Sequence, residues 1–360
     1  MEFLVQCDPK FPYNDIVDIR QRLLKSNALV FGYAFEKFDL FSIESILHLQ
    51  HFEEKKIQLL PDLNIVSRMI NVAQFGIPSR MDDVTKLAID LMAFSQTMNI
   101  FIEPSIAFHE LASCEGNQKA LEKLAWFRVA DYGQANSWVD LAQGRIQRLP
   151  SVSLKETQKL DLAYPLSRWR RNYIVALKIA ELELSNLTQL DRALSLLKWM
   201  VQDYFFAGPA AIFATMYFSP HKKKRVIKNL HSTDRERAIR GIKNAAWDIT
   251  HMSDFVAKIN KNDQNIKQGE YFIFATADKS LAEIAPVLIY NSSKYDQVDE
   301  LARNLSKWWP SVEALKISEV LTQYLRDIEG RPPPTSTLPS DNPIQFMIEK
   351  GERIIKGTVK

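Results

Sequence analysis

Cysteine and glycine are both scarce in this chain of 360 residues. Its two cysteines, Cys7 and Cys114, are too few for a disulfide framework or for a cysteine-based zinc site of the usual spacing. The chain has 11 glycines, whereas average usage would give about 25. Because turn-rich barrels and sandwiches need glycine where φ is positive, this shortage argues against an all-β fold, and we expect helix to dominate.

Long apolar runs and a strong excess of one charge are also missing. The 46 Lys and Arg residues nearly balance 43 Asp and Glu residues, for a net charge of +3, so composition alone does not indicate a nucleic-acid binder. Residues 1–8 (MEFLVQCD) lack the basic start and apolar run of a signal peptide. No uncharged stretch approaches the roughly 18 residues that a membrane span needs. We therefore expect a soluble, cytoplasmic protein.

Several catalytic motifs are absent as well. The chain contains no G-x-x-x-x-G-K-[ST], no G-x-G-x-x-G and no G-x-S-x-G, which gives no support to a P-loop ATPase, a Rossmann enzyme or an α/β-hydrolase. His48 and His51 have the three-residue spacing that zinc sites use, but no further ligand follows at suitable spacing.

Short apolar runs that suit buried strands are present and are separated by helical patterns. The predicted strands are residues 57–61 (IQLLP), 99–102 (NIFI), 271–275 (YFIFA) and 286–290 (PVLIY), with 28–33 (ALVFGY) as a less supported fifth. Polar residues and then a helical pattern follow most of these runs. This alternation predicts an α/β fold in which helices flank a small parallel sheet.

The organisation of the chain follows from where the strands and the proline-rich segment lie. Residues 330–343 (GRPPPTSTLPSDNP) hold five prolines and are not expected to form regular structure. We predict a mostly helical segment at 1–56, an α/β domain at 57–290 interrupted by a helical insertion at about 118–235, a helical segment at 291–329, and a linker and tail at 330–360.

Acidic residues follow two of the predicted strands. Asp62 and Asp278 lie where ligands bind in open parallel sheets, beyond the carboxyl ends of the strands. Glu110 lies on the helix that Pro104 opens. A fourth acid would complete an oxygen-ligand site for Mg²⁺ or Mn²⁺.

Two residues are candidates for that fourth acid. At about 100° per residue, Asp248 lies about 80° from the centre of the apolar stripe of its helix and Asp254 about 160° away. Asp248 is therefore the inward candidate, and Asp254 is kept as the alternative.

Three of these segments resemble, in order, acidic motifs of PIN-domain nucleases: residues 60–64 (LPDLN), 104–112 (PSIAFHELA) and 274–281 (FATADKSL). The resemblance spans 57–290 discontinuously, and Asp248 would supply the remaining acid. It implies a compact α/β/α nuclease in which four acids bind one or two Mg²⁺ or Mn²⁺ ions and cleave a phosphodiester, usually in RNA. Many such proteins are toxins of toxin–antitoxin pairs, which implies an antitoxin as partner.

The resemblance implies a role for each residue. Asp62 and Asp278 are expected to ligate metal directly, and Glu110 and Asp248 through water or to a second ion. Asn64 and Thr276 are expected to orient these acids through hydrogen bonds. The chain departs from the family in its length, because compact members are shorter and lack a long helical insertion between the acids.

Basic clusters could guide RNA toward such a centre. They are residues 221–225 (HKKKR), 169–171 (WRR), and Arg235, Arg237 and Arg240. Each also has a simpler interpretation, as a solvated cluster or, for Trp169, as a core residue beside outward arginines. We predict a Mg²⁺- or Mn²⁺-dependent endoribonuclease. The alternatives are a catalytically inactive scaffold that binds RNA or protein through the helical insertion, and a Mg²⁺-assisted phosphatase of small molecules.

Overall fold

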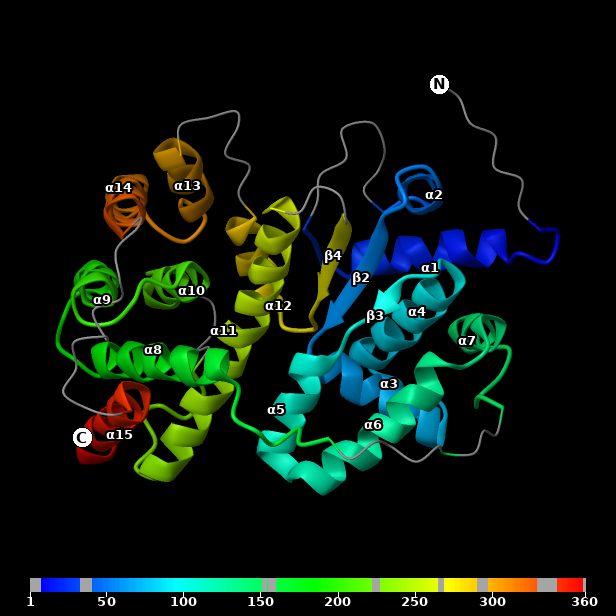
Figure 1. Cartoon of the computed structure of the whole chain (residues 1–360), viewed down its shortest axis with the longest axis horizontal. Helices are drawn as coiled ribbons and strands as arrows, with labels where there is room; N and C mark the ends of the chain where they lie inside the picture. Colours follow the sequence, from blue (N-terminus) through cyan, green and yellow to red (C-terminus); the bar gives the residue numbers. More distant parts are fainter. Residues whose placement is uncertain are drawn as a thin grey trace. The chain divides into compact units, whose positions relative to one another are not determined.

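The computed structural model is rich in helix, and the part of the chain that it describes forms one small mixed sheet of four strands (Figure 1). The described residues are 8–32, 41–150, 154, 160–221, 227–264, 269–289, 297–328 and 342–358. The expected helix-rich α/β character is confirmed. The chain divides into two compact units: unit 1 holds residues 1–164 and 254–282, and unit 2 holds 165–253 and 283–360.

Unit 1 contains the sheet and the helices around it. Its elements are α1 (Tyr13–Lys25), β1 (Leu29–Phe31), α2 (Ile43–His51), β2 (Lys56–Pro61), α3 (Leu63–Phe75), α4 (Asp83–Thr97), β3 (Phe101–Ile102), α5 (Ser105–Glu115), α6 (Asn117–Asp131), α7 (Ala135–Ala142), the end of α11 (Arg235–Gln264), β4 (Glu270–Ala275) and most of α12 (Lys279–Ile284).

The sheet has the strand order β1-β4-β2-β3. Strand β2 pairs in parallel with both β4 and β3, as the sequence predicts for the segments 57–61, 99–102 and 271–275. The expectation of a wholly parallel sheet is wrong, however, because β1 pairs antiparallel with β4, with Leu29 opposite Ala275. The segment at 1–56 therefore contributes an edge strand to the sheet in addition to helices.

The two faces of the sheet have different neighbours. Ile57, Leu59 and Ile273 belong to the apolar core that α1, α3, α4 and α5 share on one face. Side chains alternate along a strand, so Phe274 points to the other face. There it packs against Phe255 of α11, with ring centroids 5.7 Å apart.

The fourth predicted strand is wrong. Residues Ala285–Leu288 form a 3-10 helix directly after α12, and Pro286 occupies its first turn. A buried apolar run of four or five residues has no periodicity that separates strand from helix, and a proline in the first turn suits a helix start. Tyr290, the last residue of that predicted strand, lies outside the described residues.

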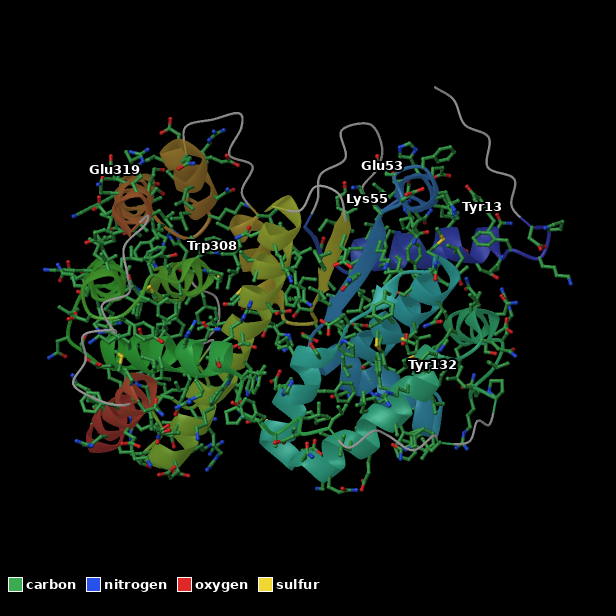
Figure 2. The ribbon with its side chains drawn as sticks, viewed as in Figure 1. Tyr13, Glu53, Lys55, Tyr132, Trp308 and Glu319 are labelled. Carbon is green, nitrogen blue, oxygen red and sulfur yellow. The ribbon has the colours of Figure 1, made fainter. Side chains whose placement is uncertain are left out.

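Unit 2 is helical in its described residues. It holds α8 (Ser167–Glu183), α9 (Gln189–Gln202), α10 (Gly208–Phe218), the first part of α11, the 3-10 turn, α13 (Gln297–Leu305), α14 (Ser311–Ile328) and α15 (Pro343–Gly357). Trp308, labelled in Figure 2, and Trp309 follow α13 and are buried. The Trp309 indole donates to the carbonyl oxygen of Thr215 at 2.9 Å, which satisfies a polar group inside the core.

The division into units differs from the expected insertion boundaries. Helices α6 and α7 lie within 118–235 but belong to unit 1, where Trp138 and Phe127 are part of the core. Within unit 2, α8 and α9 are separate helices, and Thr188 caps the second by accepting from the amide of Asp191.

A glycine in α11 marks a close approach between two backbones of unit 2. A Cβ added at Gly241 would lie 1.9 Å from the carbonyl oxygen of Lys228. Replacing glycine by alanine inside a helix normally stabilises it by up to about 1 kcal/mol. We expect Gly241→Ala instead to destabilise the protein by about 2 kcal/mol in urea unfolding, because the backbone must move. Gly208→Ala is the control, since a Cβ there meets nothing within 4 Å; equal midpoints for both variants would contradict this close approach.

Candidate functional site

The carboxyl ends of β2 and β4 lie side by side, and acidic residues follow both. The ladder continues past the strands, because the Asp62 amide donates to the carbonyl oxygen of Ala275 at 2.9 Å. Asp62 is therefore level with Thr276, two residues before Asp278. The adjacency on which the sequence argument depends is present in the structure.

The Asp62 carboxylate is buried, with 4% of the residue exposed, and both of its oxygens accept hydrogen bonds. One oxygen accepts from the amide of Ile65 at 2.9 Å and so caps α3. The other accepts from the Thr276 hydroxyl at 2.7 Å and from the Ala277 amide at 3.1 Å. Asp62 thus joins the start of α3 to the end of β4, a structural role beside the metal-binding role predicted for it.

Asp278 is connected to Asp62 through Thr276. The Asp278 amide donates to the Thr276 hydroxyl at 3.0 Å, and that hydroxyl donates onward to Asp62. One carboxylate oxygen of Asp278 accepts from the amides of Ser280 and Leu281, at 2.7 and 3.3 Å. The hydroxyl of Thr276 therefore contacts the carboxylate of Asp62 but reaches Asp278 only through its backbone amide. Asn64, the other predicted orienting residue, is exposed on the first turn of α3.

The other predicted acids are placed separately. Glu110 is half-buried on α5, and together with burial its charge raises the pKa of the Cys114 thiol one turn away. Asp248 belongs to unit 2, whereas the alternative, Asp254, belongs to unit 1. Among the residues that the structure describes, no three His, Cys, Asp or Glu side chains come together as a metal-holding group. Asp62 and Asp278 are the predicted acids that the fold brings to one edge.

A further acid at this edge was missed by the sequence analysis. Glu103 directly follows β3, and its amide donates to the carbonyl oxygen of Leu59 at 2.8 Å. Its carboxylate accepts from the Ser105 amide at 3.1 Å and from the Lys258 ammonium at 3.0 Å. The signal was available, because Glu103 comes after an apolar run and before a helix, as Asp62 does.

Lys258 of α11 holds two carboxylates. Its ammonium lies 3.0 Å from Glu103 and 3.6 Å from Asp254. Burial alone would raise the pKa of the Glu103 carboxyl, but the Ser105 hydrogen bonds and the Lys258 charge outweigh burial and leave that pKa below its usual range. Burial lowers and the two carboxylates raise the pKa of Lys258, which is raised overall. Both groups are therefore charged at neutral pH.

The donor chemistry at Asp62 and Asp278 fits a hard divalent cation. Mg²⁺ commonly binds through one or two carboxylates and keeps several waters or takes substrate phosphates. Asp278 has a second carboxylate oxygen that accepts no hydrogen bond from the described residues. That oxygen is a ligand of the type that Mg²⁺ takes, whereas both oxygens of Asp62 already accept hydrogen bonds.

Members of two of the predicted basic clusters, Trp169 and Arg235, have structural partners. Trp169 stacks on Tyr173 at 5.0 Å and packs against Trp247, so it has the predicted alternative role of a packed residue. The Arg235 guanidinium donates to three backbone carbonyl oxygens in unit 2, including that of Ile355 at 3.0 Å. Residues 222–225 lie outside the described residues.

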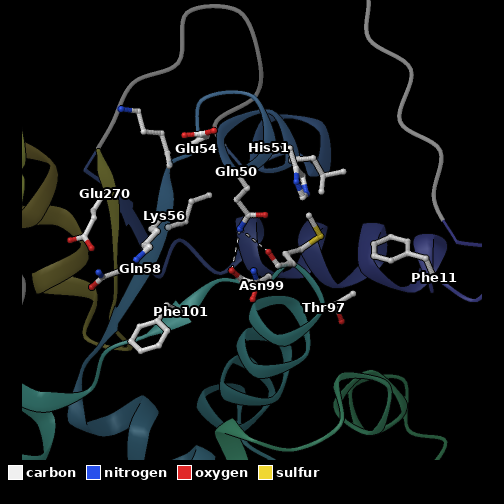
Figure 3. A pocket seen from close by; sticks show the side chains of 14 residues that line it. Phe11, Gln50, His51, Glu54, Lys56, Gln58, Thr97, Asn99, Phe101 and Glu270 are labelled. Carbon is white, nitrogen blue, oxygen red and sulfur yellow. Dashed lines mark hydrogen bonds between the residues drawn. The ribbon is translucent and has the colours of Figure 1, made fainter. Parts of the chain in front are cut away.

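A pocket of about 680 Å³ lies at the opposite end of the sheet (Figure 3). Lys56 and Glu270, which begin β2 and β4, line it. Gln50 borders it and donates to the carbonyl oxygens of Met98 and Asn99 at 2.9 and 3.1 Å. His51 lines this pocket, and His48 lies 3.3 Å from Glu53.

Comparison with known proteins finds no matching family model, no matching curated protein and no matching solved structure. None of the described helices combines the length and the apolar character needed to cross a membrane.

Proposed function

We propose that this chain is a PIN-like endoribonuclease that hydrolyses phosphodiester bonds in RNA with Mg²⁺ or Mn²⁺. The observation that carries the proposal is the junction of Asp62 and Asp278 through Thr276, at the carboxyl ends of two neighbouring parallel strands. In open α/β sheets this edge is where ligands bind. The finer assignments, a PIN-like fold with a helical insertion and a cytoplasmic toxin paired with an antitoxin, are part of the same proposal.

The chemistry of the proposed reaction sets what these residues must do. A bound divalent cation supplies a water of lowered pKa and neutralises charge on the phosphate. Asp62 and Asp278 would bind it, and the Thr276 hydroxyl would keep the Asp62 carboxylate turned toward Asp278. Glu110, on α5 of the same unit, remains the predicted outer acid of this site.

Asp278→Asn tests the proposal with little effect on the fold. Asparagine caps a helix as well as aspartate does, so the hydrogen bonds from Ser280 and Leu281 can persist. Loss of the carboxylate charge removes a metal ligand, and we expect RNA cleavage with Mn²⁺ or Mg²⁺ to fall at least about a hundredfold. The measurement uses mixed single-stranded and structured RNA beside an EDTA control.

Ser280→Ala is the matched control for this assay, because it alters the first turn of α12 and removes no carboxylate. Wild-type cleavage that persists in EDTA, or an Asp278→Asn variant as active as wild type, would refute the proposed metal site. An unchanged unfolding midpoint in Asp278→Asn would separate lost chemistry from lost folding.

A second candidate function is a catalytically inactive PIN-like scaffold that binds RNA or protein. The hydrogen bonds of Asp62 favour it, since both carboxylate oxygens already accept donors from within unit 1. In that case the acids connect helices to the sheet. Tight RNA binding that is equal with Mg²⁺ and with EDTA, without cleavage of any RNA tested, would support the scaffold over the nuclease.

A further inference from the structure

Lys258 has hydrogen-bonding capacity that the protein leaves unused. A lysine ammonium carries three N–H donors. One of them reaches Glu103 at 3.0 Å, whereas the Asp254 oxygen at 3.6 Å is beyond hydrogen-bond distance. The side chain is 28% exposed, so it is not sealed from solvent. An ammonium that is charged and has unused N–H donors can bind a further anion.

The sheet register puts Glu103, the partner of this ammonium, near Asp62, one of the proposed metal-binding acids. Glu103 is level with Leu60, one strand across from it. With strands about 4.8 Å apart and a rise of about 3.3 Å per residue, the Cα atoms of Glu103 and Asp62 are about 8 Å apart. Glu103 and Phe274 point to the same face of the sheet, where Phe255 packs one turn before Lys258.

We propose that Lys258 binds a backbone phosphate of the RNA, and that Glu103 and Asp254 hold it in position in the free protein. This inference rests on the proposed function, because it places the substrate at the same edge of the sheet. A phosphodiester carries one negative charge, and lysine binds phosphate as a point charge on a flexible stem. Glu103 keeps its hydrogen bond from Ser105, so the phosphate competes mainly with the longer contact to Asp254.

The alternative role of Lys258 is purely structural, as an ion pair that fixes α11 to the end of β3. The two roles predict different effects on RNA binding when the Asp254 carboxylate is removed. If Lys258 only supports the fold, removing Asp254 weakens the same contact as removing Lys258. If it binds phosphate, Asp254 competes with RNA, so its removal and the removal of Lys258 have opposite effects.

The experiment measures binding of a labelled single-stranded RNA 20-mer to the full chain by fluorescence anisotropy, in EDTA and over a range of salt. Lys258→Met is expected to weaken binding about tenfold and to reduce the slope of log K against log[salt] by about 1. Lys258→Arg is expected to restore most of the affinity. Asp254→Asn is expected to tighten binding severalfold, and Lys261→Met, one turn further along α11, is the matched control.

The inference is overturned if Lys258→Met leaves both affinity and salt slope unchanged, or if Asp254→Asn weakens binding as Lys258→Met does. It is also overturned if the wild-type chain does not bind the 20-mer. Because EDTA suppresses cleavage, the RNA-binding measurement is independent of the nuclease assay. RNA binding that depends on Lys258 in a chain that never cleaves would refute the proposed function and leave the phosphate site standing.

Discussion

Asp62→Ala is expected to abolish RNA cleavage and also to destabilise the protein by about 3 kcal/mol. Of this, about 1 kcal/mol comes from the lost cap of α3. About 2 kcal/mol comes from the Thr276 hydroxyl and the Ala277 amide, which lose a buried acceptor at 2.7 and 3.1 Å. Urea unfolding followed by circular dichroism gives the stability, and the metal-dependent RNA assay gives the activity.

Asp82→Ala is the matched control for this variant. Asp82 also caps a helix, α4, by accepting from the Thr85 amide, but its side chain is half exposed and no prediction places it among the metal-binding acids. We expect a loss of about 1 kcal/mol and full cleavage activity. Equal losses of stability in the two variants would contradict the cross-strand role of Asp62.

Asp62→Asn separates the two functions of the side chain. Asparagine keeps one carbonyl oxygen, so it can cap α3 or face the Ala277 amide, but its NH₂ group cannot accept from the other donor. We expect an intermediate loss of about 1–2 kcal/mol. For this reason Asp278→Asn tests the chemistry more cleanly than Asp62→Asn does.

The part of the site that could be predicted from the sequence is the part that local pattern determines. An apolar run followed by an acid and a helical pattern places Asp62 and Asp278 at the ends of β2 and β4 without knowledge of the fold. Their adjacency was a condition of the prediction, because parallel strands need not be neighbours, and the pairing of β2 with β4 in the structure meets that condition.

Other features depend on contacts between residues distant in sequence. The Lys258–Glu103 pair joins residues 155 positions apart, and neither residue carries a motif. The antiparallel direction of β1 depends on its pairing with β4, which an apolar run of three residues does not reveal. The strand predicted at 286–290 was wrong because a short apolar run looks the same in a strand and in a helix, and Ala285–Leu288 form a 3-10 helix directly after α12.

The choice between Asp248 and Asp254 also depends on information that the sequence pattern does not contain. Helix periodicity can rank Asp248 above Asp254 by the direction of each side chain from its own helix. Periodicity cannot tell which part of a 30-residue helix such as α11 belongs to which unit. The structure assigns Asp254, not Asp248, to the unit that holds the sheet, and there it pairs with Lys258.

Arg22→Met is expected to destabilise the protein by about 3 kcal/mol at pH 7, through a charge pair that motif analysis did not single out. Asp90 of α4 is 5% exposed, and its two oxygens accept from the Arg22 guanidinium of α1 at 2.6 and 2.8 Å. Removing one partner leaves a buried carboxylate without compensation, which typically costs 3–5 kcal/mol. The lower end applies because 41% of the Arg22 side chain is exposed.

The stability lost in Arg22→Met is expected to depend on pH, because it depends on the charge of Asp90. Burial raises the pKa of Asp90, although Arg22 lowers it in part. A carboxyl whose pKa is higher in the folded protein than in the unfolded chain stabilises the fold at pH values below its pKa in the unfolded chain. This stabilisation is lost as the pH rises through the pKa of the folded protein. Without Arg22 the folded pKa rises further. The stability difference between wild type and Arg22→Met should therefore be largest near pH 7 and shrink toward pH 4.

The double variant Arg22→Met/Asp90→Asn supplies the control. An uncharged asparagine removes the unpaired charge, so the double variant should recover most of the stability that Arg22→Met loses, and its difference from wild type should depend little on pH between 4 and 7. Urea midpoints at pH 4, 5.5 and 7 measure this. If Arg22→Met lost the same stability at every pH, packing of the arginine stem, and not its charge, would be what stabilises the α1–α4 contact.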